Sequence, residues 1–152
     1  MKKILSLGVT LLAVVILLTG CGSNNLSMSA TEVIEKAYEN VNIEFALGEN
    51  IAIDKENMAY YLGVDNLEIE EGYASEAMMG SIPHSVVVIK LKDGEDVEAA
   101  KKAIEENADT RKWICVEADQ KIVENIGSTV ILIMTKNELA TPIQENIKNL
   151  NN

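Results

Sequence analysis

Two runs of β-branched and aliphatic residues constrain the fold of this chain more than any other feature. They are residues 85–91 (SVVVIKL) and 129–134 (TVILIM). A strand with one face in water alternates apolar and polar residues, whereas these runs are apolar at successive positions. We therefore predict that both runs are central strands of a sheet.

Several helices are predicted from capping residues and apolar spacing. Residues 30–41 carry apolar side chains at helical intervals, and Ser29 with Glu32 matches a capping box. A second, short helix is expected to end at Gly63, because glycine tolerates the left-handed conformation that closes a helix. A third begins in an acidic turn and covers residues 96–108.

The remaining elements are also read from local pattern. Residues 67–73 alternate apolar and acidic side chains and predict a half-exposed strand. Asp119 is expected to cap a short helix that ends at Gly127. Thr141 is expected to cap the last helix, with Pro142 in its first turn.

These elements predict one α+β domain over residues 30–152. In chain order they read α α β β α α β α, which suggests a two-layer arrangement of a roughly three-stranded sheet packed with helices. The order and directions of the strands stay open. The chain is long enough for a single core and contains no internal repeat.

The first 21 residues have the pattern of an export signal. Residues 1–3 (MKK) are basic, residues 4–18 are almost entirely apolar, and Thr19 and Gly20 precede Cys21. We predict a signal peptide over residues 1–20, since the apolar run is shorter than the roughly 20 residues that span a bilayer. The small residues before Cys21 resemble a bacterial lipobox, which implies a lipid on that cysteine.

The lipobox resemblance sets the expected location and one expected partner. Residues 21–29 then form a lipidated N-terminus and a short linker, and the protein lies on the outer face of the cytoplasmic membrane, held by the lipid on Cys21. The chain has 13 basic and 24 acidic residues, a net charge of −11. Such a charge argues against nucleic acid as a partner, because phosphate binding needs basic patches. A protein of the cell envelope is the other partner considered.

No set of catalytic residues is evident, and we predict a protein that is not an enzyme and needs no cofactor. The chain lacks serine-nucleophile and phosphate-loop motifs and has a single histidine, His84. Beyond Cys21 there is one cysteine, Cys115, inside an apolar run, and we predict a buried, inert thiol. Tyr60 and Tyr61 could line a groove, although one core and one surface position is the expected arrangement.

Two groups of residues are considered as metal ligands, although no metal is predicted. Met78, Met79 and His84 carry thioether and imidazole groups, which are ligands for copper(I). Glu68 and Glu70 alternate onto one strand face and could bind a hard cation such as calcium. Ordinary packing and a solvated strand face are the competing interpretations.

Several segments of strand and helix pattern, together with a tryptophan, resemble those of a known protein family. They are residues 85–93, 96–101, 119–125 and 129–134, together with Trp113. In these the chain resembles a family of small lipoproteins from Gram-positive, low-GC bacteria that carry a C-terminal domain of unknown function. The resemblance implies a surface-tethered lipoprotein and assigns no activity. The leading hypothesis is therefore a binding or interaction module, and the alternative is a lipoprotein that handles a metal or a small solute.

Overall fold

The computed structural model describes residues 25–151. The predicted signal peptide and Cys21 lie outside the described residues. The described elements are α1 (Ala30–Ala37), β1 (Ile51–Ala52), α2 (Met58–Leu62), β2 (Ile69–Glu76), β3 (Ser85–Leu91), α3 (Val97–Asn107), β4 (Gln120–Ile126), β5 (Thr129–Thr135) and α4 (Asn137–Asn149).

The strands form one antiparallel sheet in the order β1-β2-β3-β5-β4. β3 pairs with β2 on one side and with β5 on the other, and β5 also lies between two strands. The prediction of two central strands is therefore confirmed. β1 contributes only two residues at one edge, and β4 forms the other edge.

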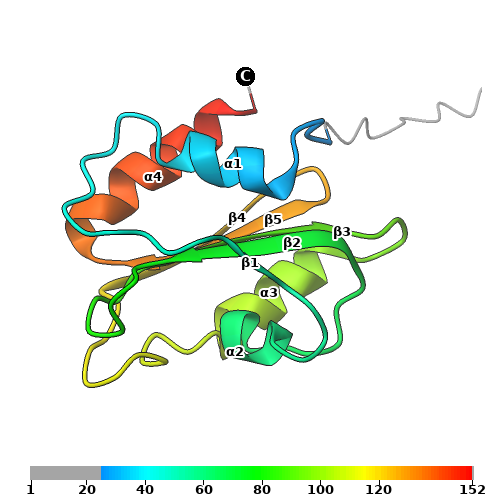
Figure 1. Ribbon diagram of the computed structural model, residues 1–152. Coiled ribbons are helices and arrows are strands. Elements are labelled where there is room, and N and C mark those ends of the chain that lie inside the picture. The colour runs from blue at the N-terminus through cyan, green and yellow to red at the C-terminus, as the bar shows by residue number, and fades with distance from the viewer. Residues whose placement is uncertain (1–24, 152) are drawn as a thin grey trace, which may run out of the picture.

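Helices cover both faces of the sheet. Figure 1 shows α1 and α4 above the sheet and α2 and α3 below it. Along β3, Val86 and Val88 belong to the core beneath α1 and α4, whereas Val87 and Ile89 belong to the core against α2 and α3. The prediction of two layers and three strands is wrong: the described residues form three layers around five strands. Strands that are apolar on both faces require cover on both.

Residues 120–126 form strand β4 and not the predicted helix. Ile122, Val123 and Ile126 fit helical spacing, but they are also β-branched and can form a strand. The two residues Gly127 and Ser128 then join β4 to β5 in a tight hairpin, and Gly127 has a φ of +56°. A two-residue loop that starts with glycine is a hairpin signal, and pairing with β5 decides the conformation.

The last helix begins at Asn137, four residues before the predicted cap at Thr141, so Pro142 lies inside it. The start is stabilised from a distance: the Asp119 carboxylate accepts a hydrogen bond from the Asn137 N–H at 3.3 Å and pairs with Lys136 at 3.1 Å. This capping group is remote in sequence, and no local pattern shows it. Among residues 25–151, no helix combines the length and the apolar character needed to cross a bilayer.

The local signals of the earlier helices are confirmed. Ser29 and Glu32 form the predicted capping box of α1, and the Asp96 side chain accepts a hydrogen bond from the Ala99 N–H at the start of α3. Gly63 ends α2 with a φ of +73°. α1 ends at Ala37, however, short of the predicted Val41.

Gly63 is expected to tolerate no side chain. A Cβ there would collide with the Asn107 carbonyl group at the end of α3, and the left-handed backbone adds strain. We expect Gly63→Ala to lower the free energy of unfolding by at least about 2 kcal/mol in urea titrations. Gly80→Ala is the matched control, because nothing lies within 4 Å of a Cβ at that position. Equal effects of the two variants would contradict this account.

Candidate functional site

Two loops meet at the end of the sheet where β2 leads into β3. The first loop, residues 77–84, joins these two strands, and the second, residues 108–119, joins α3 to β4. The Ile114 N–H donates a hydrogen bond to the Gly80 carbonyl oxygen at 3.4 Å, so the loops lie against each other. This end of the domain combines buried polar groups with exposed apolar side chains.

A buried ion pair links the second loop to the sheet. The Lys112 ammonium group lies 2.5 Å from a carboxylate oxygen of Glu76, and their side chains are 3% and 16% exposed. The rings of Tyr60, Tyr61 and Trp113 surround the ammonium group at 4.6–5.2 Å from their centroids. Burial lowers the pKa of Lys112, and the adjacent Glu76 carboxylate opposes that change. Cation–π contacts and the carboxylate together compensate the buried charge.

The same cluster contains the atoms of a serine–lysine pair but not the access that catalysis needs. The Lys112 ammonium group donates a hydrogen bond to Ser85 Oγ at 3.2 Å. Ser85, however, is completely buried, and Lys112 is already paired with Glu76. A nucleophile must reach its substrate, so these contacts support a structural role for the cluster.

His84 lies on the opposite face of the sheet, inside a second polar cluster. Its Nε2 is 2.9 Å from the Tyr38 hydroxyl and its Nδ1 is 2.8 Å from Thr135 Oγ1, and the ring is fully buried. Phe45 packs edge-on against it at 5.1 Å. Burial lowers the pKa of His84 to about 4, so the imidazole is neutral at pH 7. One ring nitrogen then donates and the other accepts.

The copper(I) set does not assemble around His84. Both imidazole nitrogens are within hydrogen-bond distance of hydroxyl groups, whereas Met78 and Met79 extend into solvent from the first loop. Within residues 25–151, no group of three or more His, Cys, Asp or Glu side chains is arranged to hold a metal ion. The described geometry therefore offers copper two exposed thioethers but no free imidazole.

The acidic candidates and the thiol also differ from expectation. Glu68 is paired with both Lys55 and Lys92 at 3.1 Å, and an irregularity in the β2–β3 register between Ile69 and Glu71 interrupts the expected alternation at Glu70. A hard-cation site at Glu68 would have to displace both lysines.

Cys115 is exposed, so the prediction of a buried thiol is wrong. Its backbone has a φ of +62°, which turns the loop and directs the residue outward although its sequence neighbours are apolar. The loop that carries it packs against the α2/α3 face, whereas His84 lies under α1. The described structure therefore does not bring the thiol and the imidazole together.

Exposed apolar residues gather on the two loops. Met78 is 70% exposed and Ile114 is 77% exposed, and Met79 and Tyr60 are also exposed. Tyr60 lies on α2, not on a loop, and its ring contacts Lys112 of the second loop. Tyr61 packs edge-to-face on Tyr60 at 4.9 Å and has its own side chain in the core, as predicted for this pair. We call Tyr60, Met78, Met79 and Ile114 the apolar tip. Of the large hydrophobic side chains exposed in the described chain, only Ile51 lies outside it.

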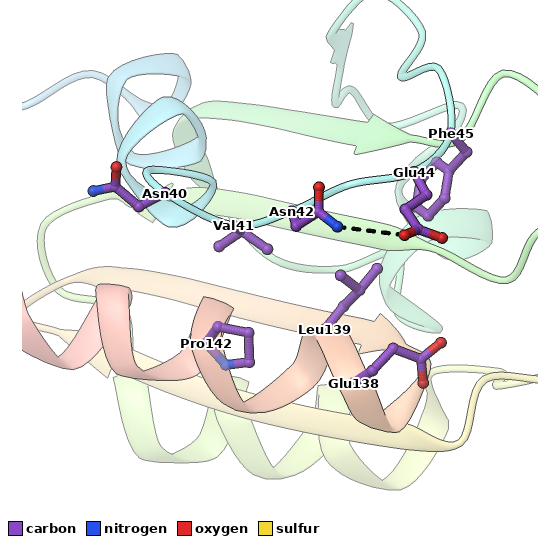
Figure 2. Close-up of a pocket in the computed structure, with 8 residues that line it drawn as sticks. All are labelled: Asn40, Val41, Asn42, Glu44, Phe45, Glu138, Leu139 and Pro142. Carbon is purple, nitrogen blue, oxygen red and sulfur yellow. Dashed lines mark hydrogen bonds between the residues drawn. The ribbon is translucent and has the colours of Figure 1, made fainter.

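A groove of about 550 Å³ lies between the segment that follows α1 and the first half of α4. Figure 2 shows Val41, Leu139 and Pro142 along its length, with Glu44 and Glu138 on opposite walls toward one end. The remaining lining residues are Asn40, Asn42 and Phe45. Its volume is in the range of ligand-binding pockets.

Sequence reasoning missed Lys112 and the groove. Lys112 stands in an ordinary polar stretch, and only the tertiary structure brings Glu76 and the three aromatic rings around it. The groove joins residues about 100 positions apart, in the segment after α1 and in α4. Comparisons with protein-family models, with curated proteins and with solved structures return no match to this chain.

Proposed function

We propose that this protein is a lipid-tethered binding module on the outer face of the cytoplasmic membrane, and that the apolar tip contacts a protein partner of the cell envelope. The observation that carries the proposal is the exposure of Met78, Met79 and Ile114 on two adjoining loops, with exposed Tyr60 of α2 in contact with Lys112 of the second loop. Single exposed hydrophobic residues are common on protein surfaces, but clustered ones mark interaction sites.

The position of the chain's entry supports a tip that faces away from the membrane. The Asn25 side chain accepts a hydrogen bond from the Ser128 N–H at 3.0 Å, at the turn between β4 and β5. In Figure 1 the described chain begins at the right (blue) and the two loops lie at the left. The tip and the turn lie at opposite ends of β3, since Ser85 pairs with Met134 and Lys90 with Thr129. Five strand residues separate these ends by about 17 Å.

The predicted lipid on Cys21 and the charge of the domain also favour a tip that faces away from the membrane. Three residues separate Cys21 from Asn25, so the two are four residue steps and at most about 14 Å apart when the chain is fully extended. A tether this short holds the turn end of the domain near the bilayer, and the acidic surface disfavours contact with anionic lipid. The tether also raises the local concentration of the tip near membrane partners.

The proposal is tested with a photoreactive amino acid at position 79 of the lipoprotein in its native cell. We expect crosslinking to one envelope protein, and we expect Ile114→Asp in the same chain to reduce that product at least about tenfold, since a desolvated charge opposes docking. The probe at position 145, on the exposed side of α4, is the matched control. Cys21→Ala is expected to remove the lipid, which is measured as loss of metabolic labelling with a radioactive fatty acid.

Other outcomes of this experiment would overturn the proposal. If the probes at positions 79 and 145 crosslink the same proteins in the same yield, the crosslinks report random collisions and not a binding site. Crosslinks from position 79 to lipid alone would show that the tip contacts the bilayer. Fatty-acid labelling that persists after Cys21→Ala would contradict the tether.

A further inference from the structure

We infer that the groove between residues 40–45 and α4 binds an extended peptide segment in which basic and apolar side chains alternate. This inference concerns a second surface, and it does not depend on the apolar tip. It rests on the shape and lining of the groove, on two acidic side chains without basic partners, and on a strand-like segment with free backbone groups.

Residues 41–44 follow α1 and belong to no strand or helix, and the chain bends at Phe45. Between residues 41 and 46 half-buried and exposed positions alternate, with Val41, Ile43 and Phe45 turned toward the core. In the described chain, the backbone N–H and C=O groups of residues 42–45 form no hydrogen bond with other backbone groups. A segment with strand-like alternation and open backbone groups is the kind of edge to which a peptide adds as a further strand.

The groove lining specifies side chains of the ligand. Val41 on one wall and Leu139 and Pro142 on the other provide apolar surface that suits aliphatic side chains. Glu44 and Glu138 lie on opposite walls, and neither forms an ion pair with a lysine or arginine among residues 25–151. Glu44 accepts only a long 3.4 Å hydrogen bond from Asn42. A lysine or arginine side chain in the groove would form charge-assisted hydrogen bonds with such a carboxylate.

The groove is held in shape by contacts outside it. Asn146 of α4 donates hydrogen bonds to the carbonyl oxygens of Ala37 and Glu39, at 3.0 and 2.8 Å, and so ties the end of α1 to α4. At its other end the segment is anchored where the Met78 N–H donates to the Ala46 carbonyl oxygen at 2.9 Å. Both walls are therefore positioned before a ligand arrives, which lowers the entropy cost of binding.

The test uses the full chain in a mild non-ionic detergent and a blocked hexapeptide of alternating leucine and lysine. Binding is followed by calorimetry in roughly physiological salt, and its position is read from amide chemical shifts. We expect saturable binding with shifts at residues 41–46 and in the first turns of α4. Glu44→Gln with Glu138→Gln is expected to weaken binding at least about tenfold.

Matched controls separate a site from general attraction between a basic peptide and an acidic protein. Glu145→Gln, on the exposed side of the same helix, is expected to change the affinity less than about twofold, because contacts outside the site are screened by salt. A second control is a peptide with glutamine in place of lysine. Its affinity for the wild-type protein should be as low as that of the lysine peptide for the Glu44→Gln, Glu138→Gln double variant. N-methylation of alternate peptide nitrogens should also abolish binding, since it removes backbone donors.

Each contrary result overturns the inference. If Glu145→Gln lowers the peptide affinity as much as a single groove substitution does, the peptide is attracted to the acidic surface as a whole. Binding of the N-methylated peptide at full strength would exclude strand addition. Displacement of the peptide by hexylammonium at similar concentration would show a small-amine site, and chemical shifts confined to the apolar tip would place the peptide there.

Discussion

Replacing Lys112 with methionine is expected to lower the free energy of unfolding by about 3 kcal/mol, because it leaves the Glu76 carboxylate without its cation. This is the lower end of the range for breaking a buried pair, since Glu76 keeps some contact with water. The variant also loses the contacts of the ammonium group with Tyr60, Tyr61 and Trp113. Urea denaturation of the purified protein measures the effect.

A double-mutant cycle shows whether the pair or the packing is responsible. Glu76→Gln added to Lys112→Met is expected to recover at least about 1 kcal/mol, because no uncompensated charge then remains. Lys36→Ala is the control, since the Lys36–Glu39 pair is about half exposed and is expected to contribute under about 1 kcal/mol. An additive double variant, or a Lys112→Met effect as small as that of Lys36→Ala, would contradict the role of the pair.

The ion pair also matters for the apolar tip. Lys112 attaches the second loop to β2, and Ile114 follows it by two residues. If the loop detaches locally before the domain unfolds, hydrogen exchange at residues 112–116 should accelerate more than exchange in β3. The Lys112→Met variant would then also weaken the crosslink proposed for the tip.

Acidification from pH 7 to pH 4 is expected to remove up to about 3 kcal/mol of stability through His84. The burial that lowers the pKa of His84 to about 4 acts only in the folded state, whereas the unfolded chain has the ordinary value of 6.5. Between these values the unfolded state binds more protons, so stability falls as the pH falls through this window. Below the folded pKa this contribution is constant.

The histidine contribution is isolated by comparison with His84→Gln. Other groups contribute as well, since hydrogen bonds lower the pKa values of Glu32, Glu68 and Asp119 in the folded state, and protonation of these carboxylates also costs stability. Subtracting the urea titrations of the variant from those of the wild type at each pH removes this shared background. The difference should depend on pH between 6.5 and 4 and should level off outside it. A flat difference would show that His84 is protonated equally in both states.

Glutamine keeps part of the polar environment of His84. Its amide can donate and accept, so Tyr38 and Thr135 retain possible partners. At pH 7 we expect the variant to lose about 1–3 kcal/mol through imperfect packing and lost hydrogen bonds, without pH dependence of its own. This separates the packing of the ring from its titration.

The candidate sites were much less predictable than the strands. Met78, Met79 and His84 are close in sequence, but His84 is turned into the core under α1 and the methionines into solvent. Lys112 had no local signal, since the partners that distinguish it come from β2, α2 and the loop itself. The groove requires two segments that only packing brings together. Sites assembled across long sequence separations leave no periodic trace in either segment.

The sequence by itself determined the elements whose signals are local. β3 and β5 follow from unbroken apolar runs, α1 begins at its capping box, and α2 ends at a glycine that accepts a positive φ. Each of these preferences depends on a few neighbouring residues. Their energies are therefore set before any distant contact forms.

The tertiary structure decided what local preference left balanced. Residues 120–126 fit a helix or a strand, and β5 selects the strand by satisfying the backbone groups along one side. The Asp119 carboxylate caps α4 at Asn137. Helices pack on both faces of the sheet because β3 and β5 present apolar side chains to each face. The groove and the apolar tip follow from that packing, because burial of apolar surface is a property of the whole fold and not of any one segment.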